Sequence, residues 1–376
     1  MLLFLIVFYF FAVLSLCEEF AKVNKGFLKI TLFITMIILV VLTSIRGGET
    51  ADYEHYRVHF DYIISTEKLF VSSNFVYEPL WCILIWCVKK IWNNYQFFVF
   101  VIGFISMFLQ YKAAKILSDL SDNCQTNNCK KTKTHLFTFF LISWGLYNCN
   151  IFVIRNTIAI LLCLCSIKYI QEKKPVRFVV FVLLATGFHY SALCFILAYW
   201  LYHYKGQLSK KMLWLIFGTI AGCALIKPML SVISRLGLGS ISTKLGAYLE
   251  SAGNYLAGTG FSQTSAMFSI AKTLINIAVV VVMGVYIYRY YKDNEKYKGY
   301  LNLYLFGCIV YVASMTIGRA FARISIYFNY FQIPMALFFV SKKKNRWISW
   351  SICVLYVLLR MIINLREVEF IPFWIN

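Results

Sequence analysis

Long apolar runs separated by short polar stretches follow one another along the whole chain. Several of these runs reach about 18 to 25 residues, the length that an α-helix needs to cross a lipid bilayer. The pattern predicts an all-α polytopic membrane protein with about 12 transmembrane helices. We expect one integral membrane domain over residues 1–376, with helices at 1–16, 27–45, 76–92, 95–117, 135–150, 152–170, 177–202, 212–230, 266–289, 300–317, 324–340 and 347–363.

Two of these segments do not fit a simple alternation of crossings. Segment 177–202 begins and ends beside basic loops, so we expect two helices that meet near Gly187-Phe188-His189. Segment 76–92 would have both flanks outside, which favours a re-entrant or interfacial helix. Such a helix is tolerated where it lines a cavity.

The polar remainder of the chain is small. Hydrophobic residues make up 60% of the sequence and charged residues 14%, against about 25% charged in a typical soluble protein. The longest polar stretches, 46–75 and 231–265, are too short to fold as independent domains, and we expect them to be external loops. Any chemistry therefore belongs to helix ends and these external loops.

The net charge of +21 comes mostly from lysines and arginines in short loops between apolar runs. This distribution is the one that the positive-inside rule gives to cytoplasmic loops of an inner or plasma membrane protein, and it does not indicate a nucleic-acid partner. On the resulting map the loop 46–75, the turn at His189 and the segment Arg319–Arg323 face outwards.

Metal or disulfide chemistry is not indicated. Most of the 12 cysteines lie inside apolar runs, where a thiol behaves as a small hydrophobe. Cys124 and Cys129 with nearby His135 give only a weak zinc pattern. We expect no metal and no cofactor, since the chain has only 16 Asp and Glu and lacks an external Asp-x-Asp.

Three arginines stand where the positive-inside rule disfavours them. Arg319 and Arg323 are four residues apart and share a helix face, and two guanidinium groups suit a pyrophosphate through bidentate hydrogen bonds. Arg155 lies between apolar stretches, a position that usually faces a cavity. The alternative is that all three snorkel to lipid headgroups.

Other polar groups fall on the same external side. His189 lies at the proposed turn and is either a proton acceptor or a neutral donor, or else a packing residue. In the loop after Arg46, Asp52 supplies a carboxylate, and Tyr53 and Tyr56 can stack on sugars. Glu78 precedes Pro79 at a helix start, where a simple helix-terminus charge effect competes with catalysis.

Taken in order, these motifs resemble the EpsG-type branch of Wzy polysaccharide polymerases. The resemblance spans about residues 40 to 340 and departs at Asn156, where glutamine is expected. The matching residues are Arg46-Gly47-Gly48, Asp52-Tyr53 with Tyr56, Glu78-Pro79, Arg155-Asn156 with Ala159, Phe188-His189-Tyr190-Ser191-Ala192, and Gly318-Arg319 with Arg323, Tyr327 and Phe328.

The resemblance implies a bacterial O-antigen or capsule polymerase that acts at the periplasmic face. Such an enzyme moves the growing glycan from undecaprenyl pyrophosphate to the non-reducing end of the next lipid-linked repeat, in some cases with a chain-length regulator as partner. Fixed cations aimed at the leaving pyrophosphate and a base for the acceptor hydroxyl are the chemistry required. A lipid-linked oligosaccharide flippase and an O-antigen ligase remain alternatives.

The residues divide into two expected roles. Arg46, Tyr53, Tyr56, Arg155, Asn156, Arg319 and Arg323 are expected to bind pyrophosphate or sugar. The candidate bases are His189, Asp52 and Glu78, in that order, because neighbouring arginines keep an imidazole neutral but weaken a carboxylate as a base. We expect Arg46, Asp52, Arg155, His189, Arg319 and Arg323 to share one external cavity.

Overall fold

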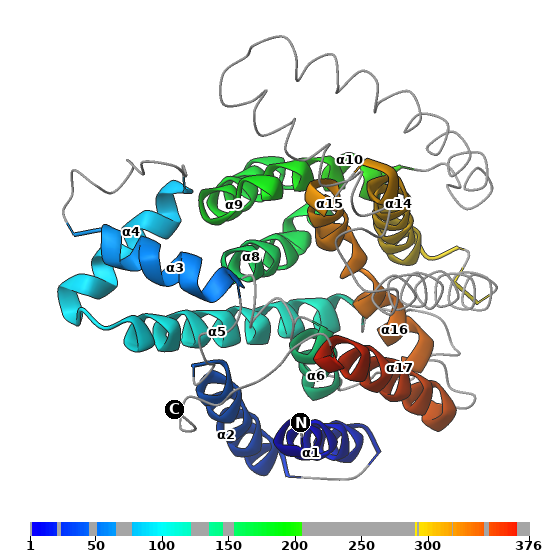
Figure 1. Cartoon of the computed structure of the whole chain (residues 1–376). Coiled ribbons are helices and arrows are strands. Elements are labelled where there is room, and N and C mark those ends of the chain that lie inside the picture. Colours follow the sequence, from blue (N-terminus) through cyan, green and yellow to red (C-terminus); the bar gives the residue numbers. More distant parts are fainter. Residues whose placement is uncertain are drawn as a thin grey trace. The chain divides into compact units, whose positions relative to one another are not determined.

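The fold is entirely helical in the part of the chain that the structure describes (Figure 1). This computed structural model describes residues 2–20, 24–44, 51–64, 77–121, 135–145, 154–204, 290–291, 293–317, 319–341 and 346–366. The all-α prediction is therefore confirmed. The predicted helices at 212–230 and 266–289, the loop 231–265 and the Cys124–Cys129 segment lie outside the described residues.

The helices follow the predicted apolar segments closely. They are α1 (Leu2–Phe20), α2 (Lys25–Ser44), α3 (Ala51–Tyr62), α4 (Pro79–Ile91), α5 (Tyr95–Ser121), α6 (His135–Gly145), α8 (Ile154–Gln171), α9 (Pro175–Phe188), the 3-10 helix η2 (Tyr190–Leu197), α10 (Ala198–His203), α14 (Glu295–Ile317), α15 (Arg319–Asn329), α16 (Gln332–Ser341) and α17 (Arg346–Arg366).

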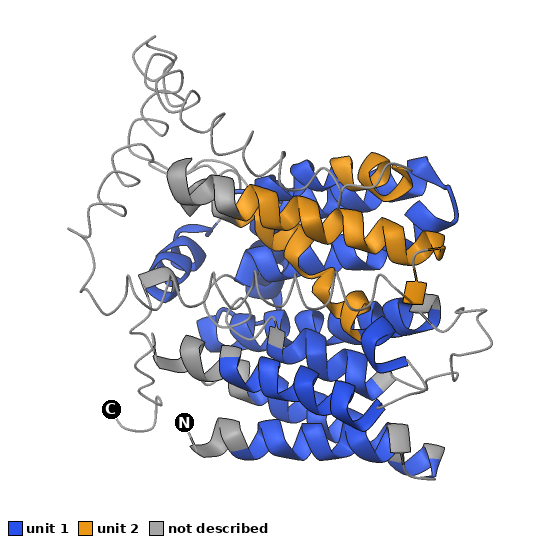
Figure 2. Ribbon diagram, turned by 90° about the vertical axis from the view of Figure 1, so that its right-hand side faces the viewer, with its two compact units in different colours: residues 1–196, 337–376 blue, residues 197–336 orange. Residues whose placement is uncertain are grey.

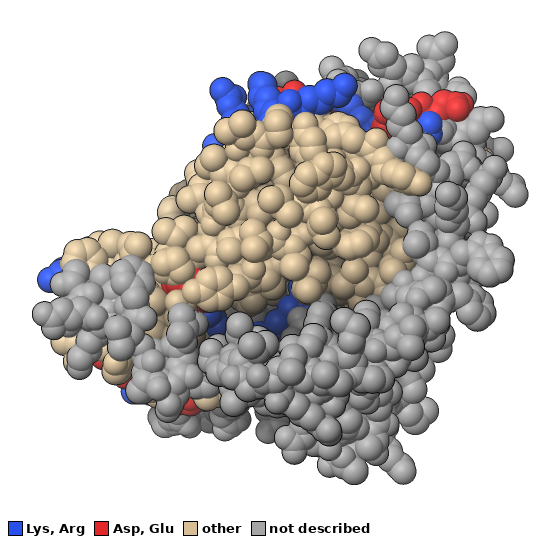
Figure 3. Space-filling view, turned by 90° about the horizontal axis from the view of Figure 1, so that it is seen from above, with Lys and Arg blue, Asp and Glu red and all other residues tan. Residues whose placement is uncertain are grey.

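Several of these helices have the composition of membrane spans. Among the described residues, Tyr95–Asp119, Ile154–Gln171 and Arg323–Ser341 are long and apolar enough to cross a bilayer. Shorter apolar helices occur at Ile6–Glu18, Lys29–Val41, Pro175–Phe188 and Arg346–Leu359. In the view of Figure 3, Lys and Arg gather along one edge of the described surface beside a broad uncharged area. Both features identify a membrane protein.

The chain divides into two compact units, residues 1–196 with 337–376, and residues 197–336 (Figure 2). In the first unit α5 is 27 residues long, or about 40 Å at the α-helical rise, and it contacts α2, α4, α6 and α8. Helix α8 is buried on almost all sides. A helix that is apolar all round belongs in a protein interior, so α8 lies at the centre of this unit.

Polar side chains inside these helices bond within the protein. The hydroxyl groups of Thr31, Ser118 and Thr186 each donate to the carbonyl four residues earlier, at 2.8 Å. Between helices, Ser143 Oγ donates to Gln110 Oε1 at 2.9 Å. In lipid such groups have no water to bond to, so internal partners are required.

The α8–α9 connection has a defined helix stop and start. Lys173 has a positive φ of 54°, the Lys174 N–H donates to Tyr169 O at 2.8 Å, and the Lys173 N–H donates to Ile170 O at 3.1 Å. These are the two bonds of a Schellman motif, which satisfies the last carbonyls of α8. Pro175 then occupies the first turn of α9, where its missing N–H has no cost, and the result is a tight hairpin.

The predicted break near Gly187 is confirmed. Helix α9 ends at Phe188, His189 is extended, and η2 starts at Tyr190. Gly187 lets this end of α9 approach α4, because a Cβ there would lie 2.6 Å from the side chain of Leu80. At 13 residues, α4 is shorter than the roughly 20 that a spanning helix needs. Its placement as a re-entrant or interfacial helix stays a prediction.

Helix α3 was not predicted, since we expected only a loop over 46–75. Its residues Tyr53, Tyr56 and Phe60, with Ile63 directly after the helix, recur at intervals of three and four and are all buried. This spacing is typical of an amphipathic helix. The helix was missed because polar residues lie between these positions, so the segment contains no long apolar run.

In the second unit, α10, α14 and α15 pack together. Gly299 of α14 lies against the ring of Tyr202, and Gly307 lies against Phe328 and Asn329 of α15. The Asn302 amide donates to the carbonyls of Leu201 and Tyr204 at 3.3 and 3.0 Å, and so caps the end of α10. The segment predicted at 324–340 corresponds to the candidate span Arg323–Ser341, which a turn at Tyr330 and Phe331 divides into α15 and α16.

Candidate functional site

The candidate site lies in the first unit, where α3, α4, α8 and the α9–η2 turn meet. Glu78 immediately precedes Pro79, the first residue of α4, and adopts the extended conformation of an N-cap residue. Its carboxylate nevertheless makes no capping hydrogen bond to the described first turn of α4. Helix capping, the simple explanation for an acidic residue here, therefore does not account for its orientation.

The carboxylate of Glu78 instead pairs with Arg155, the second residue of α8. Arg155 Nη1 donates to Glu78 Oε2 in an ion pair whose side chains are 18% and 5% exposed, respectively. An ion pair so far from water is stable only with good geometry and further hydrogen bonds. The second oxygen has one, because the Tyr190 N–H donates to Glu78 Oε1 at 3.2 Å.

Two aromatic rings flank the guanidinium of Arg155. Its Cζ lies 4.7 Å from the ring centroid of Tyr77 and 5.4 Å from that of Tyr56, both within the range of a cation–π interaction. The buried Nε–H, however, finds no acceptor among the residues that the structure describes. Arg155 thus donates to Glu78 through Nη1, while its Nε–H makes no hydrogen bond to the described residues.

His189 ends α9 directly before Tyr190, whose N–H reaches Glu78. The side chain is 7% exposed, and its Nδ1 accepts a hydrogen bond from the Ser191 N–H at 3.3 Å and lies 2.6 Å from Ser191 Oγ. If Nδ1 accepts the N–H, a neutral ring carries its proton on Nε2. His189 is then a hydrogen-bond donor, one of the two roles expected from the sequence.

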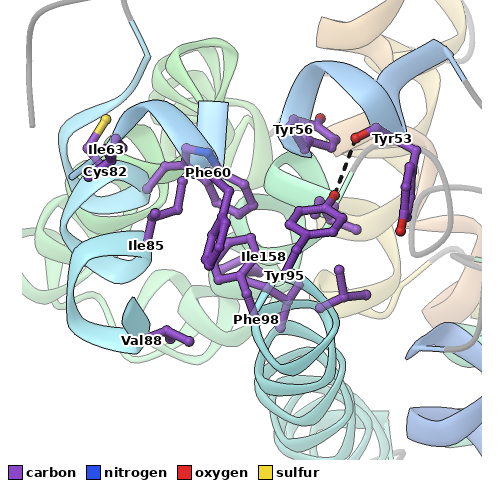
Figure 4. Packing of buried hydrophobic residues seen from close by; sticks show 14 residues of the cluster. Tyr53, Tyr56, Phe60, Ile63, Cys82, Ile85, Val88, Tyr95, Phe98 and Ile158 are labelled. Atoms are coloured by element: carbon purple, nitrogen blue, oxygen red, sulfur yellow. Dashed lines mark hydrogen bonds between the residues drawn. The ribbon is translucent and has the colours of Figure 1, made fainter. Parts of the chain in front are cut away.

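Tyr53 and Tyr56 are both buried on the inner face of α3, at 5% and 3% exposure. Figure 4 shows them beside Tyr95 and Phe60 in a cluster of buried hydrophobic residues, with Tyr95 Oη donating to Tyr53 O at 3.4 Å. The Tyr53 hydroxyl also accepts a hydrogen bond from Gln96 Nε2 at 3.0 Å. Their stacking on a sugar stays a prediction, since in this structure the rings serve the core.

His59 extends the site beyond the residues found from the sequence. Its imidazole stacks on Tyr77 with ring centroids 3.7 Å apart, and its Nε2 lies 3.7 Å from Cys82 Sγ. Burial, together with the positive charge of Arg155, lowers the pKa of His59 from 6.5 to about 4. The ring is therefore neutral at physiological pH.

The structure brings together four of the expected site residues: Tyr56, Glu78, Arg155 and His189. Asn156 is buried beside Arg155 in α8. Asp52 lies in the first turn of α3, four positions before Tyr56, but the placement of its side chain is not described. That register puts both residues on one face of the helix.

The remaining expected residues are not tested by the geometry. Arg46 lies outside the described residues, as does the side chain of Arg319. Arg323 is exposed on α15 in the second unit. The shared cavity of six residues therefore remains a prediction.

The sequence reasoning missed Tyr77 and His59 as site residues. Tyr77 was visible as the neighbour of Glu78, and His59 follows Tyr56 by three positions on a helix that was not expected.

Among the described residues, no group of three or more His, Cys, Asp and Glu side chains is placed to hold a metal ion.

Comparison with known proteins gives one match. The sequence profile of the EpsG family covers residues 29–374, a range that contains the whole candidate site. No curated protein and no solved structure matches the chain.

Proposed function

Because the chain belongs to the EpsG family, the family of Wzy-type polymerases, we propose that it is a membrane glycosyltransferase that polymerises a polysaccharide. The substrate in this proposal is an oligosaccharide repeat on undecaprenyl pyrophosphate at the periplasmic face of the inner membrane. The glycan passes from one carrier lipid to the non-reducing-end hydroxyl of the next repeat. Family membership by itself identifies a membrane protein of the polysaccharide polymerase type.

The proposal rests mainly on the hydrogen bonds that the Arg155 guanidinium makes and leaves unmade. A guanidinium has five donors in a planar fork, and Glu78 accepts from Nη1 while the buried Nε–H has no acceptor among the described residues. A phosphoryl oxygen accepts such a bond well. We propose that the Nε–H of Arg155 binds the pyrophosphate, and that Arg46, Arg319 and Arg323 supply the remaining positive charge.

In this mechanism the bond between the sugar C1 and the pyrophosphate oxygen breaks as the acceptor hydroxyl oxygen attacks C1. The pyrophosphate leaves with the electron pair and needs no proton, but its charge must be stabilised by cations already in place. Glu78 holds Arg155 in orientation. His189, as a neutral donor through Nε2, binds a sugar or phosphoryl oxygen.

The acceptor hydroxyl must lose its proton to a base. Both oxygens of Glu78 are engaged, one by Arg155 and one by the Tyr190 N–H, and Nδ1 of His189 is engaged by Ser191. We therefore propose Asp52 as the base, on the same face of α3 as Tyr56. Asn156, Tyr53 and Tyr56 complete the proposed binding set.

The genetic test is a deletion strain whose surface glycan is separated by size. Loss of polymerisation leaves a single repeat without a ladder, and the wild-type gene restores the ladder while Arg155→Ala, Arg319→Ala and Arg323→Ala do not. A strain with no surface glycan at all would instead indicate a flippase or a ligase.

A further inference from the structure

Tyr77 connects two groups of the site that do not share a helix. Its ring lies 3.7 Å from the imidazole of His59, at an interplanar angle of 23°, and 4.7 Å from the guanidinium carbon of Arg155. His59 belongs to α3 and Arg155 to α8, while Tyr77 precedes α4. Tyr77 therefore contacts both Arg155, a member of the ion pair, and His59.

We propose that Tyr77 and His59 are positioning residues that hold the guanidinium of Arg155 in the orientation that presents its Nε–H to the lipid pyrophosphate. The inference rests on the proposed function in so far as pyrophosphate is the ligand of Arg155. Neither residue needs to touch the substrate. Their effect passes through the direction in which Arg155 points.

An arginine side chain has many rotamers, and Glu78 fixes only one point of it. Ring contacts with Tyr77 and Tyr56 restrict the plane of the guanidinium as well, because a planar cation has its favourable contact over the face of a ring. Tyr77 is in turn held by its stack on His59, which is 6% exposed. The orientation of Arg155 thus depends on a residue of α3 that it does not pair with.

The charge of His59 matters to this arrangement. Its imidazole faces Tyr77, Cys82 Sγ of α4 at 3.7 Å and the positive charge of Arg155, whose partner is Glu78. The pKa of His59, lowered to about 4 by burial and by Arg155, keeps the ring neutral near pH 7. A protonated His59 would place a second cation beside Arg155 and oppose its orientation. The site is therefore built for a neutral imidazole.

The test is steady-state polymerisation by the purified full-length protein with an undecaprenyl-pyrophosphate-linked repeat. Tyr77→Leu removes the ring, whereas Tyr77→Phe keeps it. We expect Tyr77→Leu to reduce kcat/KM by about 10- to 100-fold, since a small misorientation of a binding group has effects of that size. Tyr77→Phe should retain most of the wild-type rate. Val58→Ala, on the exposed face of α3, is the matched control and should leave the rate unchanged.

The pH profile separates positioning from simple packing. Wild-type kcat/KM should fall as the pH is lowered towards 4, whereas His59→Phe, which retains a ring but cannot be protonated, should lose that part of the decline. His59→Leu should behave like Tyr77→Leu at every pH. If Tyr77→Leu fails to fold, the comparison of His59→Phe with His59→Leu decides the question.

Arg155→Ala, assayed in parallel, distinguishes a failure of the positioning inference from a failure of the proposed function. An active Arg155→Ala variant would overturn the proposed role of Arg155 itself. If Arg155→Ala is inactive while Tyr77→Leu and His59→Leu keep wild-type KM, kcat and pH profile, the positioning inference is wrong and the proposed function stands.

Discussion

Glu78 occupies the N-cap position of α4, yet its carboxylate pairs with Arg155 at the start of α8. The two residues are 77 positions apart in the chain and their pair is almost closed to water. A carboxylate that leaves its own helix for a buried arginine is explained poorly by helix capping or by snorkelling. The pair therefore defines the centre of the candidate site.

The ion pair should show strong coupling. Removing one partner of a buried pair leaves an uncompensated charge and typically costs about 3 to 5 kcal/mol. We expect Glu78→Gln and Arg155→Met each to lower the midpoint of thermal unfolding in detergent. The double variant should unfold at a higher temperature than the sum of the two shifts predicts. Strictly additive shifts would mean that the two side chains do not interact.

The choice of base is tested by single-turnover polymerisation across pH. Removing a general base costs about 10² to 10⁴ in rate, so we expect Asp52→Asn to fall by that factor. We expect His189→Ala to fall less and to keep the wild-type pH profile, because His189 acts as a hydrogen-bond donor. The reverse result, a dead His189→Ala and an active Asp52→Asn, would identify the imidazole as the base and disprove the assignment.

The α8–α9 hairpin offers a stabilising substitution away from the site. Lys173 has a left-handed φ of 54°, a conformation that a residue with a Cβ adopts at a cost of about 1 kcal/mol. Lys173→Gly should raise the unfolding midpoint and leave polymerisation unchanged, whereas Lys173→Val should lower the midpoint. A lower midpoint for the glycine variant would show that the Lys173 side chain itself stabilises the turn.

Catalysis is expected to need no metal. Metal-dependent glycosyltransferases hold a hard cation with several oxygen ligands, and this chain has only 16 Asp and Glu in 376 residues. Polymerisation by the purified protein should therefore continue after treatment with EDTA. Loss of activity that magnesium or manganese restores would contradict this expectation.

The long helices could be predicted from the sequence because hydrophobic length reports directly on membrane spans. The break at His189 was also predictable, from the basic loops on both sides of segment 177–202. Helix α3 was not, because its buried residues Tyr53, Tyr56 and Phe60 are spaced among charged ones and form no apolar run.

The candidate site could be predicted only residue by residue. Arg155 and Glu78 were identified separately, as an arginine in an apolar context and an acidic residue before a proline. Their pairing could not be derived, since it depends on how α4 packs against α9 through Gly187 and Leu80. His59 and Tyr77 could not be identified from the sequence for the same reason, since their contacts with the site depend on how the helices pack.

The most direct measurement is polymerisation by the purified protein in proteoliposomes with a synthetic undecaprenyl-pyrophosphate-linked repeat as sole substrate. We predict glycans of increasing length together with stoichiometric release of undecaprenyl pyrophosphate. Arg155→Ala should be inactive, and Arg155→Lys strongly impaired, because an ammonium group cannot reproduce the planar fork of donors of a guanidinium. Transfer of the intact lipid-linked repeat across the bilayer without any new glycosidic bond, or full activity of Arg155→Ala, would contradict the account.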